Sequence, residues 1–289
     1  MIPDNPGPLL IAVSIGELTL VVVGLIAIFR LGFTPKGRTV LTAPSPLPNW
    51  PISIIDFGLA CLAVIVGGIA GQILAGFYAN QPGLDENLRL MIYGGGFQGG
   101  LLAGAASASY TLRRQVASYC VSAEEAVPVA DPLPPPAYNI WQAGSVTFVV
   151  AIPILLALSL GWTFILESFG LNTDKQELVD LFANTDSVPI VIGMTVLAAV
   201  IAPLAEELIF RAGFFRFMRK RTPRWLAYVL PAAVFASLHG NLFAFVPLFT
   251  LGLIFAYAYE RTGNIRVSII AHALFNLHTI LLLLAGVEV

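Results

Sequence analysis

The fold is decided by a long uncharged stretch, residues 225–259, which reads WLAYVLPAAVFASLHGNLFAFVPLFTLGLIFAYAY and is followed by Glu260. A hydrocarbon core needs roughly 20 apolar residues for each helix that crosses it. The stretch is therefore too long for one span. The tripeptide His239-Gly240-Asn241 lies near its middle and offers a break. We predict two membrane helices here, the second from about Phe243 to Tyr259.

The rest of the chain has the same character. Hydrophobic residues make up 57% of it and charged residues only 11%, and the mean hydropathy is +0.83. A soluble domain carries about 25% charged residues. Six further spans are expected, which gives an all-α, polytopic transmembrane helix bundle of about eight spans: Leu9–Phe29, Ile52–Ala79, Leu90–Leu112, Ala143–Leu166, Val188–Phe210 and Ser268–Ala285. The net charge of -2 gives no indication of a nucleic-acid partner.

The basic residues orient this bundle. Of the 15 Lys and Arg, all but Arg89 and Lys175 fall on alternate loops. They are Arg30, Lys36, Arg38, Arg113, Arg114, Arg211, Arg216, Arg219, Lys220, Arg221, Arg224, Arg261 and Arg266. Because basic loops stay in the cytoplasm, we predict an integral protein of the cell (inner) membrane with both termini outside the cytoplasm.

Proline-rich stretches and glycines indicate the organisation of the chain. A linker at 128–139 separates an N-terminal three-helix region, 1–127, from a C-terminal five-helix region, 140–289. Glycines at four-residue spacing in the second and third spans, such as Gly67/Gly71 and Gly96/Gly100, predict close helix packing. A short helix outside the membrane is expected at Asn172–Asn184.

Ionisable residues inside a span are costly and need an explanation. Glu17 lies in the middle of the first span, where pairing with another helix or protonation would explain it. Asp56 lies near the interface at the start of the second span, where we expect it to be solvated.

The fifth predicted span ends in a denser cluster, with Glu206, Glu207 and Arg211. Adjacent helical residues point about 100° apart, so the two carboxylates cannot share a face. Glu207 and Arg211 are four residues apart and can pair. Glu206 is then left without a partner on its own helix, and an unpaired carboxylate in a low-dielectric cavity is suited to act as a general base.

Two histidines complete the polar set. His239 lies in the sixth span, four residues after Phe235, and His272 lies in the eighth, four residues before Asn276 on the same face. A single histidine in a helix is more often a core residue than a catalyst, but two in separate spans, with an unpaired glutamate, favour a functional site. His278 lies about 120° away from the face of His272, and we leave it out.

Three motifs, in this order, resemble those of the CAAX protease and bacteriocin-processing (CPBP, or Abi) family of intramembrane peptidases, which includes the Ras-converting CAAX prenyl endopeptidase. They are Glu206-Glu207-x-x-x-Arg211, Phe235-x-x-x-His239 and His272-x-x-x-Asn276. The resemblance covers about 188–286, and the first three spans show no match.

The resemblance implies an endopeptidase that cleaves a membrane-embedded or lipid-anchored peptide or protein. Glu206 would be the general base, His239 would help to hold and polarise the attacking water, and His272 with Asn276 would stabilise the oxyanion. Glu207 and Arg211 would be structural. The family is also described as a metalloprotease, with Glu206, His239 and His272 as candidate zinc ligands. We favour the metal-free mechanism because no HExxH-type pair fixes two ligands on one helix.

Two other functions remain open on the sequence. A transporter or channel also uses broken helices and buried carboxylates, although no inverted repeat is visible and the polar residues cluster in one half. A catalytically silent family member would act by binding partners in the membrane. No sequence feature distinguishes a prenylated tail from a bacterial peptide or protein as the substrate.

Overall fold

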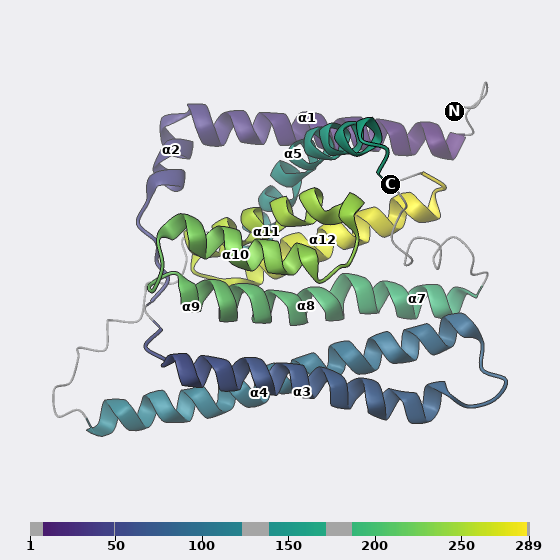
Figure 1. Ribbon diagram of the computed structural model, residues 1–289. Helices are drawn as coiled ribbons and strands as arrows, with labels where there is room; N and C mark the ends of the chain where they lie inside the picture. The colour runs from purple at the N-terminus through teal and green to yellow at the C-terminus, as the bar shows by residue number, and fades with distance from the viewer. Residues whose placement is uncertain (1–7, 49, 123–138, 172–186, 288–289) are drawn as a thin grey trace.

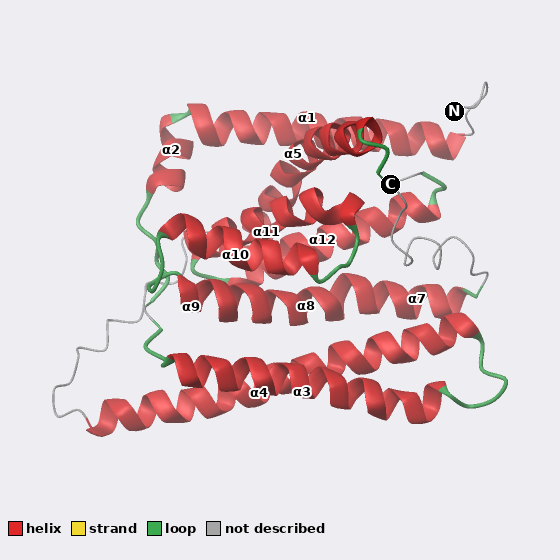
Figure 2. Ribbon diagram, viewed as in Figure 1, coloured by secondary structure: helices red, strands yellow, loops and turns green. Residues whose placement is uncertain are grey.

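The computed structural model describes residues 8–48, 50–122, 139–171 and 187–287. Within these ranges every regular element is a helix (Figure 2), so the predicted all-α class is confirmed. The elements are α1 Pro8–Phe33, α2 Pro35–Thr42, α3 Ile54–Ala79, α4 Glu86–Ser122, α5 Ile140–Ser168, α7 Val188–Val196, η1 Leu197–Ile201, α8 Ala202–Glu207, η2 Leu208–Phe215, α9 Arg216–Met218, α10 Arg224–Ser237, α11 Leu242–Thr262 and α12 Ile265–Leu284.

A helix lies at each of the eight predicted spans. Six are long and apolar enough to cross a bilayer, with α7 to α9 forming one continuous helix over Val188–Met218. The other two helices, α4 and α10, are less apolar or shorter than these six. In α4, glycines and Gln98 replace larger apolar side chains, and α10 has only 14 residues, which rise about 21 Å. The chain is thus a polytopic membrane protein, and the count of eight spans stays a prediction.

The predicted break in the uncharged stretch is confirmed. Helix α10 ends at Ser237, and Gly240 adopts the left-handed conformation with φ +65°. Asn241 then begins α11, because its side-chain oxygen accepts a hydrogen bond from the Ala244 backbone N–H. This turn places the end of α10, with His239, beside the start of a new helix.

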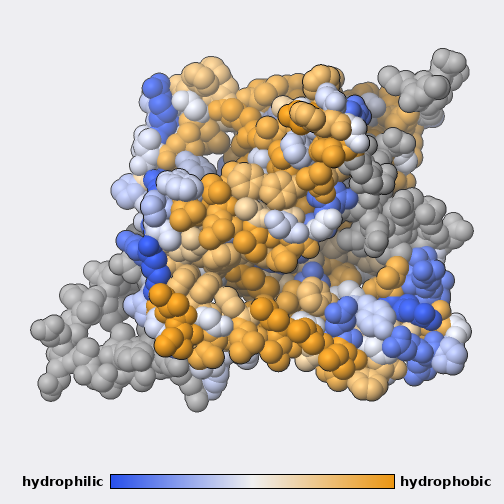
Figure 3. All heavy atoms as spheres, in the orientation of Figure 1, coloured by the Kyte–Doolittle hydropathy of each residue, from blue (hydrophilic) through white to orange (hydrophobic). Residues whose placement is uncertain are grey.

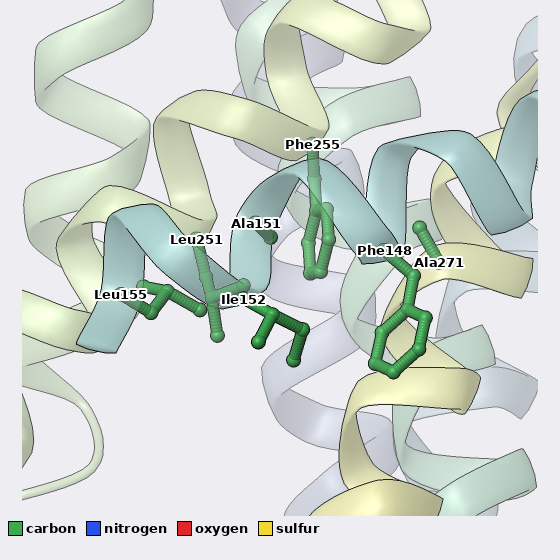
Figure 4. Close-up of a cluster of buried hydrophobic side chains, with 7 residues drawn as sticks. All are labelled: Phe148, Ala151, Ile152, Leu155, Leu251, Phe255 and Ala271. Atoms are coloured by element: carbon green, nitrogen blue, oxygen red, sulfur yellow. The ribbon is translucent and has the colours of Figure 1, made fainter. Parts of the chain in front are cut away.

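The centre of the molecule is built from α5, α11 and α12. Phe148, Ala151, Ile152 and Leu155 of α5 pack against Leu251 and Phe255 of α11 and Ala271 of α12 (Figure 4). Of these three helices, α12 carries the predicted site residues His272 and Asn276. The core therefore fixes the relative positions of α11 and α12.

The first three spans lie on two flanks of this centre (Figure 1). Helix α1 packs against α5, whereas the α3–α4 hairpin packs through α4 against α7, η1 and α8. The division of the chain into regions 1–127 and 140–289 stays a prediction. Most of the linker and the short helix expected at Asn172–Asn184 lie outside the described residues.

Glycines bring α3 and α4 together, as their spacing predicts. A β-carbon on Gly71 would lie 2.1 Å from the carbonyl oxygen of Gly96, and one on Gly100 would lie 2.1 Å from that of Gly67. No side chain fits at these distances. The glycines therefore let the two backbones come into contact. Such close packing stabilises helix pairs in a bilayer, where the hydrophobic effect does not drive helices together.

The basic loops meet at one end of the bundle. Arg219 donates to the carbonyl oxygen of Leu47, and Arg261 donates to that of Leu41. In Figure 3 hydrophilic residues collect at two opposite edges, one of them beside α2 and α9, with a broad apolar surface between them. The side of the membrane that this end faces stays a prediction.

Candidate active site

The two acidic residues sit on a short α-helical piece between two π-helical segments. Helix α8, Ala202–Glu207, is preceded by η1 and followed by η2, and Pro203 stands in its first turn. Proline lacks a backbone N–H and leaves a carbonyl of the preceding turn without its usual donor. Single π turns inside α-helices are frequent at functional sites.

Asn276 supplies a hydrogen bond to this irregular region. Its side-chain Nδ2 donates to the carbonyl oxygen of Ala198 in η1 at 2.8 Å. The amide of α12 thus holds the helix that presents Glu206. The predicted role of Asn276 in stabilising an oxyanion stays a prediction.

The predicted pair of Glu207 and Arg211 is formed. Arg211 Nη1 lies 2.9 Å from Glu207 Oε1, and both side chains are buried. The guanidinium carbon also lies 4.7 Å from the centre of the Phe235 ring and 5.4 Å from that of Phe255. Aromatic faces on both sides shield this ion pair from solvent.

Glu207 makes a second contact that the sequence did not reveal. His272 Nδ1 lies 3.0 Å from Glu207 Oε1, the oxygen that also receives Arg211. An ionised carboxylate only accepts hydrogen bonds, so Nδ1 carries the proton and donates it. The ring is thereby turned so that Nε2 lies 3.7 Å from Glu206 Oε2. Glu207 thus orients His272 toward Glu206.

Glu206 is the more accessible of the two acids. Its side chain is 18% exposed, whereas that of Glu207 is fully buried. The distance of 3.7 Å to His272 is too long for a direct hydrogen bond. It is short enough for one oxygen atom to lie about 3 Å from both groups, which is the geometry a reacting atom needs.

The motif Phe235-x-x-x-His239 contacts His272 through the ring of Phe235. The buried Phe235 ring has its centre 4.9 Å from that of His239 and 6.1 Å from that of His272, with both contacts edge to face. His239 Nδ1 bonds the carbonyl oxygen of Phe235 at 2.9 Å. No ion pair joins His239 to Glu206 within the described residues, and Phe235 is the link between the two histidines.

The same residues can be judged as a metal site. Across residues 8–48, 50–122, 139–171 and 187–287, no group of three His, Cys, Asp or Glu side chains has the arrangement to hold a metal ion. Glu206 and His272 approach each other, but the ring of His239 is directed to its own helix. The three residues do not fit a closed zinc centre in this arrangement, and we derive no step through a metal.

Two polar residues of the first spans lie away from the site. Glu17 Oε1 lies 2.7 Å from His278 Nε2, which joins α1 to α12. Pairing was one of the two explanations expected for Glu17, and it agrees with leaving His278 out of the site. Asp56 forms a capping box with Ser53 at the start of α3, so it is hydrogen bonded as well as partly exposed.

Comparison with known proteins bears on this arrangement. Residues 188–278 match the family described as "Type II CAAX prenyl endopeptidase Rce1-like". The C-terminal part of the chain is thus similar to the CAAX prenyl endopeptidase family. The match contains all three motifs, so the resemblance based on them is confirmed.

Two proteins that this chain resembles are bacterial. The chain is 26% identical over 120 residues to "Putative membrane peptidase YdiL" of Bacillus subtilis, covering 42% of this chain and 48% of that protein. It is 35% identical over 107 residues to "UPF0177 protein YbdI" of Lactococcus lactis subsp. lactis, covering 37% of this chain and 54% of that protein. The chain thus spans about half the length of these relatives. No solved structure matches it.

Proposed function

We propose that this protein is an intramembrane endopeptidase that hydrolyses a peptide bond in a membrane-associated substrate. The observation that carries the proposal is the approach of Glu206 Oε2 to His272 Nε2 at 3.7 Å, inside apolar helices of the CAAX endopeptidase region. Ionisable groups in such helices are expensive and are retained where they do chemistry.

Glu206 is the general base of the proposed reaction. It is partly exposed and makes no ion pair with its own helix, so a water molecule can reach its free carboxylate. The water loses a proton to Glu206 and attacks the carbonyl carbon of the scissile bond. The protonated Glu206 then gives the proton to the departing amine, as a general acid.

His272 stabilises the oxyanion in this mechanism. With Nδ1–H held by Glu207, Nε2 can donate only when the ring carries both protons. In that form Nε2–H would point toward the developing oxyanion beside Glu206. Preorganised donors of this kind are worth about 3 to 4 kcal/mol in acyl transfer.

Asn276 and His239 have supporting roles in the proposal. Asn276 lies one turn from His272 and adds an amide donor near the oxyanion, while its bond to Ala198 keeps the helix of Glu206 in place. His239 helps to hold the attacking water from the turn that follows α10, where its ring is partly exposed.

The mechanism proposed here needs no metal. In the alternative zinc mechanism, Glu206, His239 and His272 would hold the ion, which would supply a Lewis acid. The substrate is a membrane-embedded or lipid-anchored peptide or protein, either a CAAX-type prenylated tail or a bacterial peptide. We place the protein in the cell membrane with its basic loops in the cytoplasm and both termini outside it.

The test is a comparison of protein termini in membranes that hold the wild type or Glu206→Gln. We expect new termini with the wild type only. Glu167→Gln is the matched control, because Glu167 is an exposed carboxylate at the end of α5 and should leave the wild-type pattern. Identical termini in all three membranes would overturn the proposal and favour a transporter, a channel or a silent member.

A further inference from the structure

A second polar site lies at the basic end of the bundle, away from Glu206. It is a cavity of about 600 Å³ between the segment that follows α2 and the facing ends of α9, α10 and α11. Its walls combine residues 41–45 with charged residues, namely Arg219, Lys220, Arg224, Glu260 and Arg261. The proposed peptidase mechanism uses none of these groups.

Glu260 organises the cations of this cavity. It is buried near the end of α11, where Oε1 accepts from Arg219 Nε at 2.8 Å and Oε2 accepts from Arg224 Nη2 at 2.9 Å. The hydroxyl of Tyr228 donates to the same Oε2. One buried carboxylate thus fixes two guanidinium groups, and Arg219 also donates through Nη1 to the carbonyl oxygen of Leu47.

Arg261 gives a separate indication that the cavity binds a ligand. Its side chain is only 9% exposed and donates to the backbone carbonyls of Leu41 and Ala43. Its Nε is buried without a hydrogen-bond partner among the described residues. A buried charged donor without an acceptor is destabilising. An anion bound in the cavity that Arg261 lines would supply the missing acceptor.

The charge of the cavity is strongly positive. Four basic residues face one acid, so the lining carries an excess of three positive charges. Arginine forks match the oxygens of phosphate groups, and the flexible ammonium of Lys220 adds a point charge. The chemistry therefore fits an anion with several oxygens better than a single carboxylate.

The depth of the cavity indicates the source of that anion. Trp225 is exposed beside Arg224 at the first turn of α10, and tryptophans of this kind lie at the level of the lipid headgroups. The end of α1 and all of α2 lie at the same end of the bundle (Figure 1), and their residues Phe33 and Val40 are exposed. We infer that this cavity binds the phosphate of an acidic phospholipid headgroup.

The inference is tested by native mass spectrometry of the full chain in detergent, with phosphatidylglycerol and phosphatidylcholine as probes. Lys220 and Arg224 are both exposed, so Lys220→Gln with Arg224→Gln should fold normally. Each basic residue near an acidic headgroup contributes about fivefold in affinity. We expect one retained phosphatidylglycerol per wild-type chain and about 30-fold weaker binding in this double variant.

The matched control is Lys36→Gln with Arg266→Gln, which removes the same charges from exposed positions at the same end but outside the cavity. It should bind phosphatidylglycerol like the wild type. Glycerol 3-phosphate is the soluble arm, and equal competition by it would assign the site to a free phosphate ester. Equal losses in both double variants, or equal retention of phosphatidylcholine, would overturn the inference whether or not the protein is a peptidase.

Discussion

Replacing Glu207 by Gln should separate two tasks that one carboxylate oxygen performs. Glu207 Oε1 receives both Arg211 Nη1 at 2.9 Å and His272 Nδ1 at 3.0 Å. Removing one partner of a buried ion pair costs about 3 to 5 kcal/mol, because the other charge stays buried. For a chain of this size we expect Tm to fall by on the order of 10 °C.

A second substitution should restore stability without restoring activity. In Glu207→Gln with Arg211→Met, no buried charge is left unpaired, and the methionine fills the space between Phe235 and Phe255. The large cost of breaking a buried ion pair comes from the charge left unpaired, and the double variant leaves none, so most of the lost Tm should return. His272 still lacks its ionised acceptor, and turnover should stay about 10- to 100-fold low.

The assay combines thermal unfolding in detergent with cleavage of a substrate identified from the membrane termini. Arg211→Met alone is the control, since it leaves Glu207 charged and buried and should also unfold early. A double variant as unstable as Glu207→Gln would refute the stabilising pair. Full recovery of turnover in the double variant would refute the orientation of His272 by Glu207.

Further expectations concern chemistry, topology and packing. Glu206→Gln should abolish cleavage and leave Tm within about 1 °C, because this acid holds no ion pair on its own helix; a large fall in Tm would contradict that. Reporter fusions at Lys220 and at Asp85 should read cytoplasmic and external respectively, and the reverse would overturn the orientation. Elemental analysis should find no stoichiometric zinc in wild type or His272→Ala; one zinc per wild-type chain and none in the variant would sink the metal-free mechanism. Gly71→Ala should lower Tm by several degrees, since its β-carbon would meet backbone 2.1 Å away, and an unchanged Tm would mean that the hairpin can part there.

Much of the helix arrangement could be predicted because the bilayer limits what a chain can do. Apolar length marks a span, so the break at His239-Gly240-Asn241 could be located within a residue or two. Glycine spacing marked the α3–α4 contact for a similar reason, since only small residues allow such an approach. The same glycines lower the hydropathy of α4, so apolar length alone did not establish whether α4 is a span.

The site was only partly predictable. The spacing of Glu207 and Arg211 determined their pairing, because residues four apart on a helix are neighbours. The contact of Glu207 with His272 joins residues 65 apart in sequence, and no local pattern encodes it. The π-helical turns on either side of Glu206 were also invisible. Their residues are almost all apolar, so a change in helical period leaves no trace in the hydropathy pattern.

The contact between Glu17 and His278 has a consequence for how the chain enters the membrane. The two residues are 261 positions apart, so α1 leaves the ribosome long before its partner in α12 exists. A carboxylate alone in the bilayer costs about 3 kcal/mol on insertion scales, which favours holding α1 at the insertion machinery or keeping Glu17 protonated. The α3–α4 hairpin, by contrast, can close as soon as α4 is made. Assembly would therefore end with α12 capturing the first helix, and the site would be completed in the same step.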